Sequence, residues 1–100
     1  MRYKQDVGAA SLVDITGGGA QAGTYFLNLC NRGDDDVKVR VAITAAGQAP
    51  TLGDYVEYDA TLKSKGALGR WPIALEANER VYVYASATGV SANLVGRAEA

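Results

Sequence analysis

Short segments in which apolar and polar residues alternate follow one another along most of the chain. In residues 37–44, VKVRVAIT, every odd-numbered residue is a β-branched apolar one and the even-numbered residues are mainly polar. This period of two places one side of a strand against a core and the other side toward water. The pattern recurs at short intervals between polar or glycine-rich turns, which indicates a small all-β fold.

The alternation predicts about seven strands in a single antiparallel β-sandwich, of either jelly-roll or Ig-like type. The expected strands are residues 11–16, 24–30, 37–44, 54–62, 67–75, 80–87 and 90–97. Gly17–Gly19 separates the first two, because glycine breaks regular structure. In strand 54–62, the alternation points Tyr58 toward the core and Tyr55 outward.

Strand 67–75 carries two further expectations. Pro72 cannot donate a ladder hydrogen bond, so this strand is expected to be an edge strand or to contain a bulge. Trp71 falls in register with Ile73 and Leu75, which favours a place in the core. The alternative is an exposed Trp71 that could stack on a sugar.

Residues 1–9 look like an extended N-terminal arm, and residues 10–100 form the sandwich domain. Tyr3 and Val7 are the only substantial apolar groups of this arm. Such an arm frays in isolation, whereas in an assembly it can lie on a neighbour. We expect its deletion to leave the fold intact and to abolish binding to that neighbour.

The composition favours a single domain that functions as part of a larger assembly. One hundred residues with one Trp, one Phe and one Met make a thin core, and contact with other subunits would add buried area. Ten basic and eleven acidic residues nearly cancel, which argues against a nucleic-acid groove and gives no support for a membrane surface. No apolar run suits a secretory signal or a membrane span.

The sequence offers little catalytic chemistry, and we expect neither an enzyme, nor a cofactor, nor a metal site. It contains no histidine, the commonest general base and zinc ligand. The acidic residues Asp54, Glu57 and Asp59 share one strand, and Asp34–Asp36 form a turn without the spacing of a calcium loop. Both groups are typical of solvated surface. Cys30 has no second cysteine to pair with, and we interpret it as a small apolar residue near a strand end.

Tyrosines on the outward side of two strands are the main surface feature. Tyr82 and Tyr84 alternate with the core-facing Val81 and Val83, and Tyr55 is a third outward tyrosine. Sheet surfaces favour tyrosine in general, and protein–protein interfaces are also enriched in it. The sequence leaves both explanations open. The candidate partner-interface residues are therefore Tyr3, Val7, Tyr55, Tyr82 and Tyr84.

The segment from Leu27 to Ser86 resembles small β-sandwich virion proteins of tailed bacteriophages. The resemblance rests on the order of four stretches, LNLCNRGDDDVKVRVAIT, GDYVEYDATL, KGALGRW and ALEANERVYVYAS. It implies a non-catalytic structural protein of the virion and does not fix the position of the protein in the particle. The leading hypothesis is a capsid decoration or cement protein on the outer surface of the virion, assembled in the host cytoplasm, that forms a homo-oligomer and binds the major capsid protein or other virion proteins. The alternative is a tail, collar, baseplate or fibre component, with host-surface glycan binding as one role.

Overall fold

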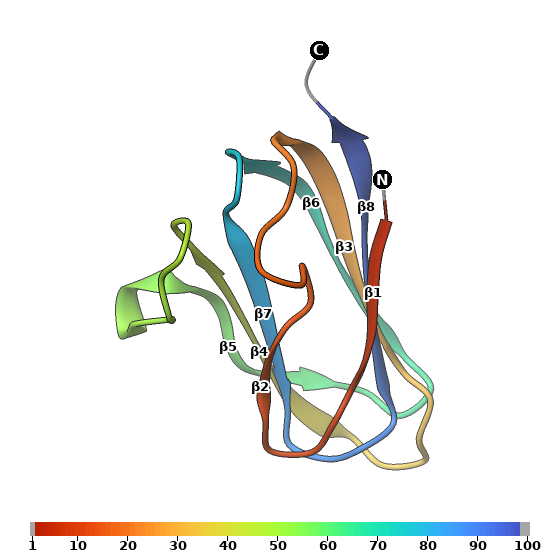
Figure 1. Cartoon of the computed structure of the whole chain (residues 1–100). Coiled ribbons are helices and arrows are strands. Elements are labelled where there is room, and N and C mark those ends of the chain that lie inside the picture. The colour runs from red at the N-terminus through yellow and green to blue at the C-terminus, as the bar shows by residue number, and fades with distance from the viewer. Residues whose placement is uncertain (1, 99–100) are drawn as a thin grey trace.

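Eight strands make up the protein in the computed structural model, which describes residues 2–98 (Figure 1). A 3-10 turn at Leu52–Asp54 precedes the fifth strand. The strands are β1 (Arg2–Val7), β2 (Leu12–Asp14), β3 (Gly23–Asn31), β4 (Val37–Thr44), β5 (Tyr55–Leu62), β6 (Ala67–Leu75), β7 (Arg80–Ala85) and β8 (Val90–Ala98).

The strands form two four-stranded antiparallel sheets that lie against each other as two layers (Figure 1). One sheet has the order β1-β8-β3-β6 and the other the order β2-β7-β4-β5. The inward side chains of both sheets build one core between the layers. Its fully buried members include Tyr25, Leu27, Leu29, Val39, Val41, Leu62, Val81, Val83, Val90 and Leu94. The predicted all-β, sandwich-like arrangement is thus confirmed.

Two strands, β3 and β7, follow the predicted alternation over their whole length. In β3, buried and more exposed residues alternate from Gly23 to Asn31, and β7 shows the same pattern. The expectation for Pro72 is also confirmed, because β6 is an edge strand and its pairing with β3 shifts register beside this residue.

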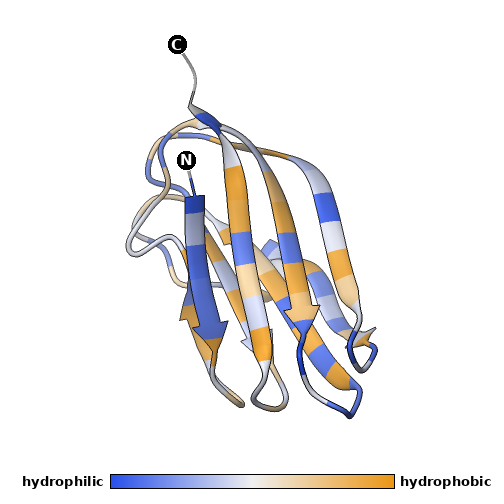
Figure 2. Cartoon of the chain, turned by 90° about the vertical axis from the view of Figure 1, so that its right-hand side faces the viewer, coloured by the Kyte–Doolittle hydropathy of each residue, from blue (hydrophilic) through white to orange (hydrophobic). Residues whose placement is uncertain are grey.

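Residues 2–7 form a paired strand and not the free arm that the sequence predicted. β1 pairs with β8 in unbroken register from Arg2 opposite Val95 to Val7 opposite Val90. Figure 2 shows that β1 is hydrophilic along most of its length. Its sequence therefore lacks the alternation of apolar and polar residues that predicts a strand. Val7 is only 1% exposed and belongs to the core. Removal of residues 1–9 would delete this core side chain and uncover the edge of β8, so the deletion is expected to destabilise the fold, contrary to the sequence-based expectation.

A register shift in β6 places Trp71 on the surface, so the predicted core position was wrong. Leu68 faces inward opposite Leu29, and Ile73 faces inward opposite Tyr25. These two inward positions are five residues apart, an odd number, because the pairing shifts between them. Trp71 and Pro72, at the shift, both remain exposed. Trp71 is 62% exposed. A bulge of this kind reverses the alternation within one strand.

A second bulge turns Tyr58 outward, against the expectation that it faces the core. In the pairing of β4 with β5, Val39 lies opposite Ala60 and Val41 lies opposite Glu57. Tyr58 and Asp59 therefore share the place opposite a single residue, Arg40. Asp59 adopts a positive φ of 53° there, and Tyr58 is 53% exposed.

Candidate interaction surface

The outward side of the β2-β7-β4-β5 sheet gathers four of the six tyrosines around one arginine. We call this surface the tyrosine–arginine face; it consists of Arg40, Tyr55, Tyr58, Tyr82 and Tyr84. Tyr84 lies opposite Arg40 across β7 and β4, and Ala42 lies between Tyr82 and Tyr55. The three sequence-predicted tyrosines of this surface therefore do come together.

Arg40 is the centre of the face. Its guanidinium carbon lies 4.2 Å from the ring centroid of Tyr58 and 4.8 Å from that of Tyr84, within the range of cation–π attraction. Its Nε also donates to Oδ1 of Asp59 at 2.7 Å. This hydrogen bond raises the pKa of Arg40 and lowers the pKa of Asp59. The arginine is therefore charged, held in place and electrically compensated.

The remaining tyrosines are held by their own contacts. The rings of Tyr55 and Tyr58 meet edge to face with centroids 5.0 Å apart, a favoured arrangement of aromatic pairs. The Tyr82 hydroxyl accepts from Nη1 of Arg80 at 3.2 Å and donates to the carbonyl of Gln48 at 3.5 Å. Tyr55, Tyr82 and Tyr84 are half-buried. Rigid, partly exposed aromatic side chains of this kind are suited to binding another protein.

The two predicted interface residues of the N-terminal segment do not join this face. The Tyr3 hydroxyl accepts from the backbone N–H of Gln21 at 3.1 Å, and the Tyr3 ring packs near Tyr25 with centroids 6.1 Å apart. Val7 is buried in the core and has no surface to offer a partner.

The structure adds Arg40 and Tyr58 to the face. The alternation in β4 already places Arg40 on the outward side. A correct prediction that β4 pairs with β7 would therefore have placed Arg40 beside Tyr84. Tyr58 could not be found in this way, because a bulge reverses its side.

Asp54 of the 3-10 turn and Glu57 of β5 each have a separate partner. Asp54 accepts from the backbone N–H of Thr51 at 2.8 Å, and Glu57 accepts from Arg70 of the other sheet at 2.8 Å. In the turn of residues 34–36, Asp36 accepts from Ser64 N–H at 2.9 Å. Among residues 2–98, no three acidic or cysteine side chains gather in a way that could hold a metal ion.

The opposite sheet carries a smaller aromatic patch at its β6 edge. The rings of Trp71 and Phe26 lie with centroids 6.4 Å apart, and Phe26 is 40% exposed. The Phe26 ring lies over Gly69, where an added Cβ would come within 2.9 Å of it. Glycine at this position therefore lets the phenylalanine lie flat on the sheet beside the exposed tryptophan.

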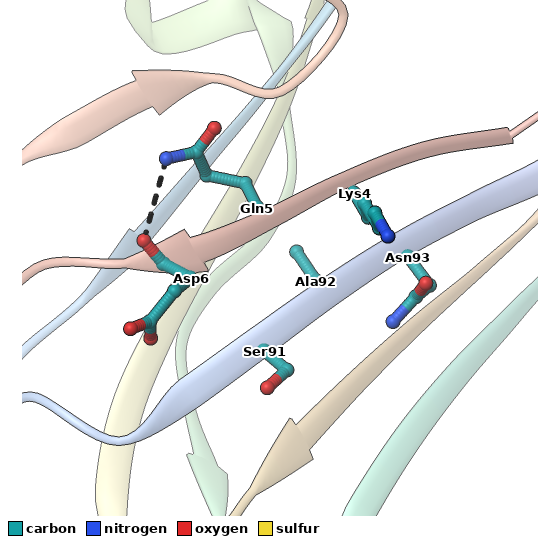
Figure 3. A pocket seen from close by; sticks show the side chains of 6 residues that line it. All are labelled: Lys4, Gln5, Asp6, Ser91, Ala92 and Asn93. Atoms are coloured by element: carbon teal, nitrogen blue, oxygen red, sulfur yellow. Dashed lines mark hydrogen bonds between the residues drawn. The ribbon is translucent and has the colours of Figure 1, made fainter.

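A shallow, open depression of about 380 Å³ lies over β1 and β8 (Figure 3). Its lining consists of Lys4, Gln5, Asp6, Ser91, Ala92 and Asn93. The Gln5 side chain points to the other side of β1 from the Asp6 carboxylate, and its amide contacts the Asp6 carbonyl at 3.4 Å (Figure 3). The side chains thus spread apart and do not converge on a ligand site.

Comparisons with protein-family models, with curated proteins and with solved structures gave no match. Within the part of the chain that the structure describes, there is no helix of the length and apolar character that a membrane crossing requires.

Proposed function

We propose that this protein is a non-catalytic structural protein of a bacteriophage virion, a capsid decoration or cement protein. It would bridge coat subunits on the outer surface of the shell as a homo-oligomer, after assembly in the host cytoplasm. Area buried across coat junctions would then raise the barrier to rupture of the shell.

The tyrosine–arginine face is the observation that carries this proposal. Tyr and Arg, together with Trp, are the residue types most enriched at the energetic centres of protein interfaces. Here Arg40 is stacked by two tyrosines and compensated by Asp59 before any partner arrives. A partner therefore gains contact with aromatic surface without having to desolvate an unpaired charge. For the same reason, binding should depend only weakly on salt.

The strand order favours the jelly-roll alternative for the fold. An Ig-like sandwich has its first two strands as neighbours in one sheet, whereas β1 and β2 lie in different sheets here. The orders β1-β8-β3-β6 and β2-β7-β4-β5 are those of an eight-stranded jelly roll, a type of sandwich used in viral capsids. A fold of this type is compatible with the proposed role but hosts other functions as well.

Cosedimentation of purified protein with undecorated phage shells tests the proposal. Tyr58→Ala removes an exposed ring that stacks on Arg40, so we expect it to weaken shell binding by about tenfold or more without unfolding the protein. The matched control is Trp71→Ala, which removes an exposed aromatic ring from the opposite sheet and should leave shell binding unchanged. Unaltered binding of the Tyr58→Ala variant would contradict the proposed surface.

Exposed Trp71 favours a second candidate, a tail or fibre component that binds host-surface glycans. Trp71 and Phe26 together expose roughly 150–250 Å² if each aromatic side chain offers about 150–250 Å² in full. This is well below the roughly 800 Å² per partner of a stable protein interface, but it is enough to cover a sugar ring. Glycan-array binding that Trp71→Ala abolishes and Tyr58→Ala leaves intact would favour this candidate over the first.

A further inference from the structure

β1 is a regular edge strand, unlike the other three edges of the two sheets. Natural proteins protect sheet edges by bulges, prolines or very short strands. β6 contains Pro72 and a register shift, β5 contains two register shifts and the positive φ of Asp59, and β2 has only three residues. β1 has six residues and an unbroken register with β8, so its free side is open to a further strand.

The charges of β1 select one way in which two copies of it can pair. In an antiparallel pair of identical strands, the numbers of any two opposed residues add to the same total. This total must be even, because residues that face inward must lie opposite residues that face inward. With a total of 10, Lys4 of each copy lies opposite Asp6 of the other copy, and the two Gln5 residues lie opposite each other at the centre. A total of 8 places Arg2 opposite Asp6 twice but also Lys4 opposite Lys4 at the centre, and a total of 12 places Asp6 opposite Asp6. Like charges directly opposite are destabilising.

We propose that a second copy of this chain pairs with β1 antiparallel, with Gln5 on the twofold axis. The two β1-β8-β3-β6 sheets then join into one continuous sheet of eight strands, and the edge of β1, which no strand of residues 2–98 covers, gains a partner strand. Interfaces with twofold symmetry use the same surface on both subunits, as this pairing does. The pairing does not depend on the proposed role in a phage shell.

The side chains of β1 support this arrangement. Among residues 2–98, Lys4 has no acidic partner, while Asp6 accepts from Arg32 at 2.6 Å in a pair that is largely exposed. An edge lysine alone discourages pairing, but in this register the Asp6 carboxylate of the second copy compensates it. The depression over β1 and β8 leaves open space beside Lys4 and Asp6 (Figure 3).

Sedimentation equilibrium of the full chain and of charge variants tests the proposal. We expect a dimer whose dissociation constant rises by about tenfold or more in Lys4→Asp and in Asp6→Lys, because each places like charges opposite each other. The double variant Lys4→Asp/Asp6→Lys restores opposite charges and should restore the wild-type constant. The control Lys38→Asp makes the same charge change on the other sheet and should have no effect. A wild-type monomer at millimolar concentration, or a dimer that the single changes leave intact, would overturn the proposal.

A disulfide across the proposed axis tests the register directly. Directly opposed residues of antiparallel strands have Cα atoms about 4.5–5.5 Å apart, within the range that a disulfide spans. In a Cys30→Ser background, Gln5→Cys should form a dimer under mild oxidation, whereas Ala67→Cys on the β6 edge should not. Equal cross-linking at the two positions, or none at Gln5→Cys, would refute the proposed register.

Discussion

Tyr25 should make the protein less stable in alkali, by an amount that its burial sets. It is 0% exposed, and its hydroxyl donates to the carbonyl of Gln21 at 2.7 Å. Burial, with the neighbouring Tyr3 as a second cause, raises the pKa of Tyr25 to about 12. An unfolded tyrosine has a pKa of about 10. Between these values the native state keeps a proton that the unfolded state has lost.

The sign and size of the effect follow from this difference. The contribution of Tyr25 to the unfolding free energy is fully present below about pH 10 and is lost as the pH rises through about 12, because the unfolded state then binds fewer protons than the native state. One pKa unit corresponds to about 1.4 kcal/mol, so the loss reaches about 1.4 kcal/mol at pH 11 and roughly 2–3 kcal/mol at higher pH.

Urea unfolding followed by circular dichroism measures this effect when wild type is compared with Tyr25→Phe. The variant lacks the titrating hydroxyl, so the difference in unfolding free energy between the two proteins should shrink by about 1.4 kcal/mol from about pH 9 to about pH 11. Tyr58→Phe is the control, because its hydroxyl belongs to a 53% exposed side chain. A difference between wild type and Tyr25→Phe that is the same at both pH values would refute the reasoning.

Two further changes test the packing and the turns. Gly96→Ala should destabilise the protein by about 1–3 kcal/mol, because the new Cβ would come within 2.3 Å of the Thr24 carbonyl oxygen; Gly53→Ala, with nothing within 4 Å of its Cβ, should have little effect in the same thermal melt. Asn31→Ala should cost about 2–4 kcal/mol in urea unfolding, since this fully buried amide donates to the carbonyls of Asp35 and Leu62 and accepts from a backbone N–H. A loss below about 0.5 kcal/mol in either the Gly96 or the Asn31 variant would contradict these roles.

Alternation in the sequence was enough to predict which side of β7 faces the core. In β7 the apolar side of the pattern is the buried side, so Tyr82 and Tyr84 could be placed outward from sequence alone. The edge position of β6 was predictable for a different reason, because Pro72 lacks the N–H that a central strand requires.

The positions that could not be predicted lie at bulges or depend on a tertiary partner. Tyr58 and Trp71 change sides because an extra residue enters the register, and nothing in a period of two marks where that happens. β1 carries mostly polar residues because even its inward side is fully buried only at Val7, while Gln5 on the same side is exposed, so the sequence resembles an arm until the pairing with β8 is seen. The stacking of Arg40 depends on both β7 and the β5 bulge, which are remote from it in sequence.

The copy number of the protein per phage particle tests the proposed function most directly. Purified virions, or shells saturated with the protein and sedimented, would be quantified against the major capsid protein. Hundreds of copies per particle are expected, because only the capsid lattice repeats that often. A few to a few dozen copies would contradict the decoration role and move the protein to the tail or collar, and no association at all would contradict a role in the virion.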